Sequence, residues 1–188
     1  MLFPPPPSIR TNPVNLRRKT AFTLIELLLV ILILSVMLGI GYSSLIRART
    51  NADFKQAINE TIGILQNARN KAMTNPEIVT DDGNVYVANA FYVTLDTSTN
   101  TLSLKAEIGD ETVEDQLLES VVLNEGVTLT VAPEDLERIS YEPPMGELTF
   151  VFTSSDGDEV IITLSMGDGA FTQNITLNQF RGMPEIVE

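Results

Sequence analysis

The 188-residue sequence contains no cysteine and no histidine. Without cysteine, disulfide bonds, cysteine-ligated zinc sites and thiol nucleophiles are all excluded. Without histidine, the side chain that most often acts as a general base is missing. No serine lies in a recognisable nucleophile motif. We therefore expect no enzymatic activity and no cofactor.

Metal-binding motifs are scarce as well. The two stretches rich in Asp and Gly, residues 81–84 and 156–158, lack the spacing of an EF-hand loop. Asp and Gly are also the residues that tight turns require, because they supply local hydrogen bonds and positive φ angles. We interpret both stretches as turns and expect no metal site. The acidic run that contains Glu111, Glu114, Asp115 and Glu119 is interpreted as a solvated loop.

Basic residues are few and unevenly placed. The chain has 12 Lys and Arg against 25 Asp and Glu, which gives a net charge of −13. Four of the basic residues and none of the acidic ones lie in residues 1–21. The remaining chain is therefore strongly acidic and repels a polyanion at long range. This distribution argues against nucleic acid as a partner.

The most prominent feature present is a long apolar run. The 20 residues from Leu27 to Ile46 carry no charge, and as a helix they extend roughly 30 Å, the thickness of a bilayer's hydrocarbon core. The basic cluster Arg17, Arg18 and Lys19 precedes the run and predicts a single pass with the N-terminus in the cytoplasm. Glu26 stands at the mouth of the run, where an unpaired carboxylate costs a few kcal/mol.

Beyond the apolar run the pattern becomes amphipathic. Apolar residues recur every three or four positions, which predicts that the helix continues with one buried face: Phe54, Ile58, Ile62, Leu65, Ala68 and Ala72. Asn75 and Pro76 predict its end, so one helix is expected from Phe22 to Thr74. Gly39 and Gly41 interrupt the apolar part. They predict either a soft segment of the helix or close packing between helices.

From Val85 onward the apolar period changes to two, which predicts strands at 85–95, 102–108, 117–123, 127–131, 148–152, 160–164 and 170–177. In the first of these, Val85, Val87, Phe91, Val93 and Leu95 are expected to share one face. Turn residues at 96–100, 154–158 and 167–169 predict hairpins. A helix followed by a run of strands predicts an α+β fold, with a long N-terminal helix packed on an antiparallel β-sheet head.

The junction between the basic cluster and the apolar run resembles a known signal. It reads Arg17-Arg18-Lys19-Thr20-Ala21, then Phe22-Thr23-Leu24-Ile25-Glu26-Leu27-Leu28. This resembles the signal of type IV pilins and type II secretion pseudopilins, although most of that family has Gly in place of Ala21. The resemblance implies cleavage between Ala21 and Phe22 by a prepilin peptidase, and N-methylation of Phe22. It also implies that Glu26 pairs with the Phe22 amine of a neighbouring subunit during filament assembly.

The resemblance implies the pilin fold and the partners of that family: prepilin peptidase, other pilin or pseudopilin subunits, inner-membrane lipid and the inner-membrane assembly platform. The expected domains are a cleaved leader at 1–21, a transmembrane and assembly helix at 22–46, its amphipathic half at 47–75, and an extracytoplasmic β-rich head at 76–188. The expected location is the inner membrane, and after assembly the pilus or pseudopilus.

The segment from Ile64 to Met73 is similar to a helix of the H-type minor pseudopilin (GspH/FimT-like) group. We therefore expect a minor pilin or pseudopilin, a structural subunit of a type II secretion pseudopilus or a type IV pilus. Two alternatives stay open. One is a FimT-like DNA-binding minor pilin of natural transformation, and the other is a membrane-anchored binding domain that never polymerises.

Overall fold

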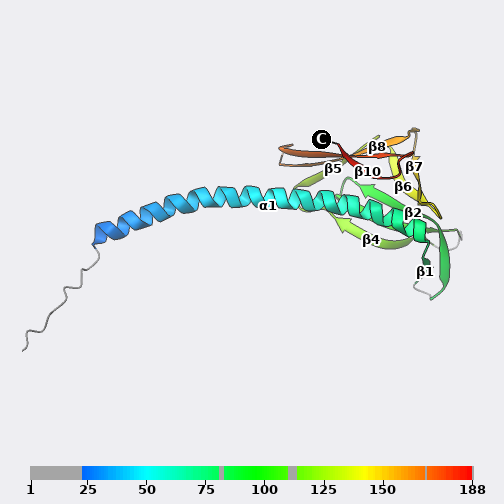
Figure 1. The fold of residues 1–188 in the computed structure, drawn as a ribbon, viewed down its shortest axis with the longest axis horizontal. Coiled ribbons are helices and arrows are strands. Elements are labelled where there is room, and N and C mark those ends of the chain that lie inside the picture. The colour runs from blue at the N-terminus through cyan, green and yellow to red at the C-terminus, as the bar shows by residue number, and fades with distance from the viewer. Residues whose placement is uncertain (1–22, 81–82, 110–113, 168, 188) are drawn as a thin grey trace, which may run out of the picture. The chain divides into compact units, whose positions relative to one another are not determined.

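A computed structural model of the chain describes residues 23–80, 83–109, 114–167 and 169–187. One helix, α1, spans Leu24–Thr74, and only strands follow it in the described residues (Figure 1). The strands are β1 (Glu77–Val79), β2 (Val85–Asp96), β3 (Thr101–Ile108), β4 (Gln116–Val122), β5 (Val127–Ala132), β6 (Leu136–Glu142), β7 (Glu147–Phe152), β8 (Glu159–Met166), β9 (Phe171–Asn178) and β10 (Pro184–Val187).

The chain divides into two compact units, and the boundary falls inside α1, between Leu45 and Ile46. The helix ends at Thr74, as predicted. Asn75 takes a left-handed φ of 40° while its N–H still donates to the carbonyl of Lys71 at 2.7 Å. Pro76 cannot continue the helix because it lacks the N–H donor.

The predicted apolar face of the helix is confirmed. Phe54, Leu65, Ala68 and Ala72 are buried, and Ile58 and Ile62 are partly buried against the same core. Three residues that the periodicity did not single out widen this face: Ala57, Thr61 and Ile64. The hydroxyl of Thr61 donates to the carbonyl of Ala57 at 2.8 Å, so its burial leaves no unpaired donor.

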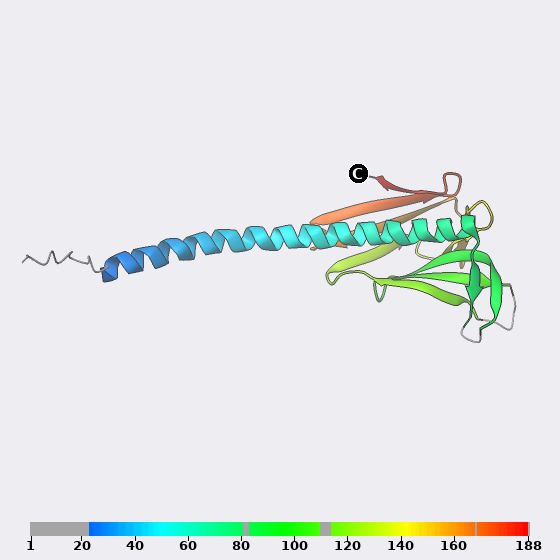
Figure 2. The same ribbon diagram turned by 60° about the horizontal axis from the view of Figure 1, so that its bottom comes forward.

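The strands form two antiparallel sheets. The first has the order β4-β3-β2-β6-β7, with β1 paired to β2, and the second has the order β10-β9-β8-β5. Residues 46–74 of α1 run alongside both sheets (Figures 1 and 2), and helix and sheet residues share one hydrophobic core. The predicted α+β class with antiparallel pairing is therefore confirmed, whereas the division of the strands between two sheets was not foreseen.

The chain crosses between the sheets after β4, after β5 and after β7. Asp135, which follows β5, binds the crossing after β7: its carboxylate accepts hydrogen bonds from the N–H and hydroxyl groups of Ser154 and Ser155, at 2.7 to 3.1 Å. These bonds hold the pKa of Asp135 below its usual range, the largest cause being the hydroxyl of Ser155. Asn100 joins the sheets similarly, since its side-chain oxygen accepts from the N–H of Leu129 at 2.9 Å.

The predicted hairpin at 154–158 is consequently wrong. β7 pairs with β6, and β8 pairs with β5 and β9, so this segment carries the chain from one sheet to the other. Its Ser, Asp and Gly residues suit an irregular connection as well as a tight turn, so composition does not reveal whether the flanking strands pair. The turns at 96–100 and 167–169 do connect paired strands, as predicted.

The predicted common face of the first long strand is also wrong for its first half. The pairing of β2 with β3 shifts register between Ala88 and Ala90, which leaves Asn89 as an extra residue. A bulge of this kind reverses the inward and outward alternation. As a result Val85 and Val87 are 55% and 58% exposed, while Ala88 faces inward.

Strand β6 was missed, although it lies in the middle of the first sheet between β2 and β7. Its sequence carries Glu137, Arg138 and Glu142, which hide the apolar alternation of a buried strand. Strands β1 and β10 were also missed. They have only three and four residues, and β10 begins with Pro184, a position in which a strand tolerates proline.

Candidate functional site

The start of α1 is the part of the methylation signal that the structure describes. Thr23 caps the helix: the N–H of Glu26 donates to the Thr23 hydroxyl at 3.3 Å and to its carbonyl at 3.1 Å. Thr-x-x-Glu is the sequence of a capping box, in which Thr accepts from the third helical residue. This cap was not predicted from the sequence. The Thr23 cap fixes the first turn of α1 and places the exposed Glu26 within that turn, at the N-terminal end of the helix.

The apolar segment that follows is exposed along its whole described length. Large side chains from Leu24 to Ile46 range from 40% to 77% exposed, and none belongs to the hydrophobic core. Water is a poor environment for such a surface, whereas a bilayer or neighbouring apolar helices can cover it. α1 is the one helix in the described residues that is long and apolar enough to cross a membrane. Together with the head that follows, this describes a single-pass membrane-anchored protein.

The helix continues without a break through residues 39–44. A Cβ atom added at Gly39 would meet nothing within 4 Å, so this glycine is not required by packing within the chain. Softening on assembly and close packing with other helices both stay predictions.

A polar network covers one face of the first sheet. The guanidinium of Arg138 on β6 forms an ion pair with Glu107 on β3 at 2.9 Å and lies 4.8 Å from the ring centre of Tyr92. The Tyr92 hydroxyl donates to Asp115, immediately before β4. Burial, together with this hydrogen bond, raises the pKa of Tyr92 above its usual range. The network joins four strands or their ends and contains no nucleophile–base pair.

The acidic run around β4 is thus only partly a solvated loop. Asp115 accepts from Tyr92, and Glu119 accepts a hydrogen bond from the amide of Asn67 on α1 at 2.6 Å. Glu114 is exposed, as predicted, and Glu111 lies outside the described residues. Two acidic residues of the run therefore join elements: Asp115 contacts β2, and Glu119 links β4 to α1.

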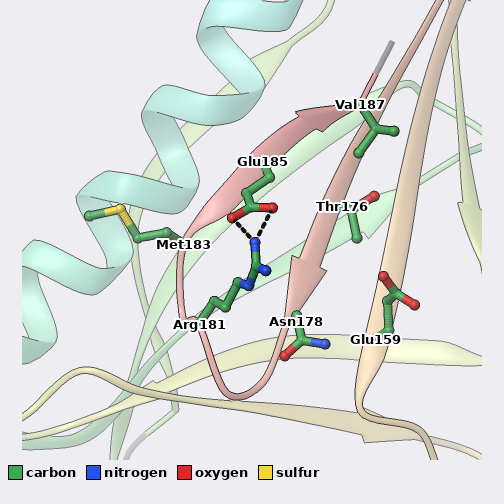
Figure 3. A pocket seen from close by; sticks show the side chains of 7 residues that line it. All are labelled: Glu159, Thr176, Asn178, Arg181, Met183, Glu185 and Val187. Atoms are coloured by element: carbon green, nitrogen blue, oxygen red, sulfur yellow. Dashed lines mark hydrogen bonds and ion pairs between the residues drawn. The ribbon is translucent and has the colours of Figure 1, made fainter.

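A polar cleft of about 340 Å³ lies at the edge of the second sheet (Figure 3). Arg181 binds both carboxylate oxygens of Glu185 through one nitrogen, across the turn between β9 and β10. Figure 3 shows these two side chains facing each other, while Met183 extends toward α1. Arg138 and Arg181 both have carboxylate partners, which reduces the positive charge that each presents to a phosphate backbone. In the part of the chain that the structure describes, no three acidic side chains gather as a metal site.

Comparison with known proteins adds two findings. The model of the family described as "Prokaryotic N-terminal methylation motif" matches residues 16–42. Among solved structures, the minor pseudopilin EpsH from the Type 2 Secretion System of Vibrio cholerae matches with a TM-score of 0.51 and 14% identity, over 72% of this chain and 96% of that chain. No curated protein matches the chain.

At that level of identity the likeness to EpsH shows the fold, which is the pilin fold: one long N-terminal helix packed on antiparallel β-structure. The family match shows that residues 16–42 carry the methylation motif of prepilin-like proteins. The combination supports a member of the type IV pilin and pseudopilin family.

The predicted site residues fall on both sides of the described boundary. Glu26 and Gly39 are described, and so is the backbone of Gly41. Outside the described residues lie the predicted cleavage pair, Ala21 and Phe22, and the basic leader cluster Arg17, Arg18 and Lys19. Cleavage, methylation and the pairing of Glu26 stay predictions.

Proposed function

We propose that this chain is a minor pilin or pseudopilin, a structural subunit rather than a catalyst. One observation carries the proposal: a helix segment exposed on all sides begins within the methylation motif and runs on into the helix that anchors the head. Such a helix can first lodge in a membrane and later pack among equivalent helices in a filament.

In the proposed sequence of events, prepilin peptidase cleaves between Ala21 and Phe22 on the cytoplasmic side of the inner membrane, and Phe22 is then N-methylated. The cut creates an ammonium group at Phe22. In the filament this cation pairs with Glu26 of a neighbouring subunit, which removes the cost of an unpaired carboxylate in an apolar setting. The assembly platform in the inner membrane moves the processed subunit into the filament.

We place the chain in the H-type minor pseudopilin group, and the filament would be a type II secretion pseudopilus or a type IV pilus. The fold likeness to a minor pseudopilin and the segment from Ile64 to Met73 support this assignment. The net charge of −13 argues against the DNA-binding alternative, because an acidic protein repels a polyanion.

Mass spectrometry of the membrane form tests the processing step. In a host with an active prepilin peptidase we expect a chain that begins at Phe22 and carries one added methyl group. A host without the peptidase serves as the control and should yield the intact leader. An intact leader in both hosts would contradict the proposal.

The substitution Glu26→Ala separates a filament subunit from a plain membrane anchor. We expect the variant to insert normally but to enter filaments roughly tenfold less often or worse, because the ammonium at Phe22 loses its carboxylate partner. The matched control is Glu125→Ala, which removes an equivalent charge from an exposed position of the head. Normal filament entry of the Glu26→Ala variant would identify the chain as an anchored domain that does not polymerise.

A further inference from the structure

Arg69 lies where α1 meets the turn between β9 and β10, and its environment is unusual. Its Nε atom is buried and has no hydrogen-bond partner within the described residues. No ion pair to Arg69 forms there either, in contrast to Arg138 and Arg181. A buried N–H group that has lost water without gaining an acceptor is costly. No carboxylate pairs with Arg69 within the described residues, although Glu147 lines a hollow in the surface that Arg69 also lines.

Arg69 lines two adjoining hollows in the surface of the head. The larger, of about 340 Å³, lies among Met145 to Leu148 and Gln179 to Gly182, and the smaller, of about 190 Å³, lies between α1 and Gly182 to Pro184. We call the two together the Arg69 cleft. The edge strand β7 begins on one side of it and the edge strand β10 on the other.

Two glycines shape this cleft around the guanidinium. Gly146 has a φ of 65°, and a Cβ atom there would lie 3.1 Å from Cγ of Arg69. Gly182 has a φ of 63°, and its Cβ would lie 3.9 Å from Nε of Arg69. Both φ angles favour glycine, and at Gly146 the close approach to the stem of Arg69 requires it as well, whereas a Cβ at Gly182 would make only ordinary contact. Backbone segments of both sheets therefore lie beside the Arg69 side chain.

The rim of the cleft is apolar and exposed. Met145 and Phe180 are 80% and 83% exposed, and Met183 is 50% exposed. Folding gains little from large apolar side chains that stay in water, but a partner that covers them gains their burial. Methionine also adapts its shape to the surface it meets. A cation surrounded by such a rim suits a ligand that combines negative charge with an apolar group.

We propose that the Arg69 cleft is a docking site for an extended segment of a partner protein, in which a carboxylate lies next to an apolar side chain. The carboxylate binds the Arg69 guanidinium and the apolar group packs against Phe180 and Met145. Charge complementarity selects this occupant, because Arg69 is the one arginine of the sheet-bearing head, within the described residues, that is partly buried and lacks a carboxylate. The proposal rests on the proposed function only in taking the partner to be a neighbouring subunit.

The test uses the full chain in detergent micelles, labelled with ¹⁵N at arginine. The probe is the pentapeptide Gly-Leu-Glu-Phe-Gly with both ends blocked, and the control peptide has Gln in place of Glu. We expect the Nε–Hε signal of Arg69, identified by its loss in Arg69→Lys, to shift with the Glu peptide. We also expect the Glu peptide to bind about tenfold more tightly than the Gln peptide, the difference typical of a hydrogen bond between charged groups. Micelle partitioning affects both peptides alike.

Two variants locate the binding. Phe180→Ser removes the exposed rim without touching the core, and it should weaken binding several-fold. Lys55→Gln is the control, because it removes an exposed cation of α1 that does not line the cleft. It should change the affinity less than about twofold, as expected for an exposed charge outside the binding site.

Three results would overturn the proposal. The first is equal affinity for the Glu and Gln peptides. The second is no shift of the Arg69 signal at about 10 mM peptide, a concentration at which even a dissociation constant of about 10 mM half-saturates the site. The third is a loss of affinity in Lys55→Gln as large as the loss in Phe180→Ser. Since the titration uses unassembled protein, its failure is distinguishable from the failure of Glu26→Ala to block assembly.

Discussion

Tyr141 and Tyr92 show how one residue type can have opposite effects in one sheet. The hydroxyl of Tyr141 is buried without a partner in the described part of the chain, and burial raises its pKa above the usual range. The hydroxyl of Tyr92 donates to Asp115. An unpaired buried hydroxyl lowers the stability of the fold, whereas a hydroxyl that donates to a carboxylate raises it.

We therefore expect Tyr141→Phe to raise the free energy of unfolding by about 1 kcal/mol, and Tyr92→Phe to lower it by about 1 kcal/mol. Urea unfolding followed by circular dichroism measures both, and each variant serves as the control for the other. A loss of stability in Tyr141→Phe would show that its hydroxyl binds an ordered water or a partner.

Asp96 predicts a pH dependence. The hydroxyl and N–H of Ser98 and the N–H of Thr99 donate to its carboxylate, and these hydrogen bonds, that of the Ser98 hydroxyl first, lower its pKa to about 2. A carboxylate whose pKa is depressed by folding contributes stability above its unfolded pKa of about 4, and this contribution is lost as the pH falls toward 2. Wild type should thus be more stable than Asp96→Ala at neutral pH, and the difference should shrink between pH 4 and 2. An unfolding series over this range measures it; a constant difference would contradict the assignment.

At the scale of elements, two glycines, one on α1 and one in the turn before β7, should respond oppositely to the same substitution. Gly63 lies on the exposed side of α1, and a Cβ there meets nothing within 4 Å. Gly146 has a positive φ, and its Cβ would lie 3.1 Å from side-chain atoms of Arg69 and Met73. Alanine favours a helix over glycine by about 1 kcal/mol but is strained at positive φ.

We expect Gly63→Ala to stabilise the head by about 1 kcal/mol and Gly146→Ala to destabilise it by about 1 to 2 kcal/mol. Thermal unfolding of the two variants beside wild type tests the pair. A neutral Gly146→Ala would mean that the turn before β7 relaxes easily, and the cleft around Arg69 would then be less rigid than the structure indicates.

The elements were predictable where the signal is local. The helix, its stop at Asn75 and its buried face followed from spacing, and most strands followed from alternation. Strand β6 was not predicted, because its charged residues Glu137, Arg138 and Glu142 hide the apolar alternation. The charge of Arg138 is accommodated in the sheet by an ion pair with Glu107 and by contact with the ring of Tyr92. The phase of β2 escaped because the bulge at Asn89 is defined by its pairing with β3. Of the candidate site, Glu26 could be found from its charge, whereas the Arg69 cleft could not.

At the scale of the whole molecule, the head should fold without the apolar segment. The hydrophobic core runs from Phe54 to Leu177 and takes no residue from the segment before Ile46. A fragment of residues 46–188 should therefore be soluble and monomeric, with a stability within about 1 kcal/mol of the full chain. Gel filtration and urea unfolding test this expectation. An unfolded or aggregated fragment would show that the head depends on the apolar segment.

The sequence by itself determined the apolar helix with Glu26 at its mouth, the amphipathic continuation and the α+β class. These features depend on length, periodicity and charge along one stretch of chain. Only the tertiary structure decided how the strands divide between two sheets, where the alternation of β2 reverses, and which arginine is left without a carboxylate. Each of these depends on residues far apart in the chain: Asp135 meets Ser154 and Ser155 at a crossing, and Gly146 and Gly182 meet at Arg69. Contacts between residues far apart in the chain form only on folding, and they produce no periodic pattern in the sequence.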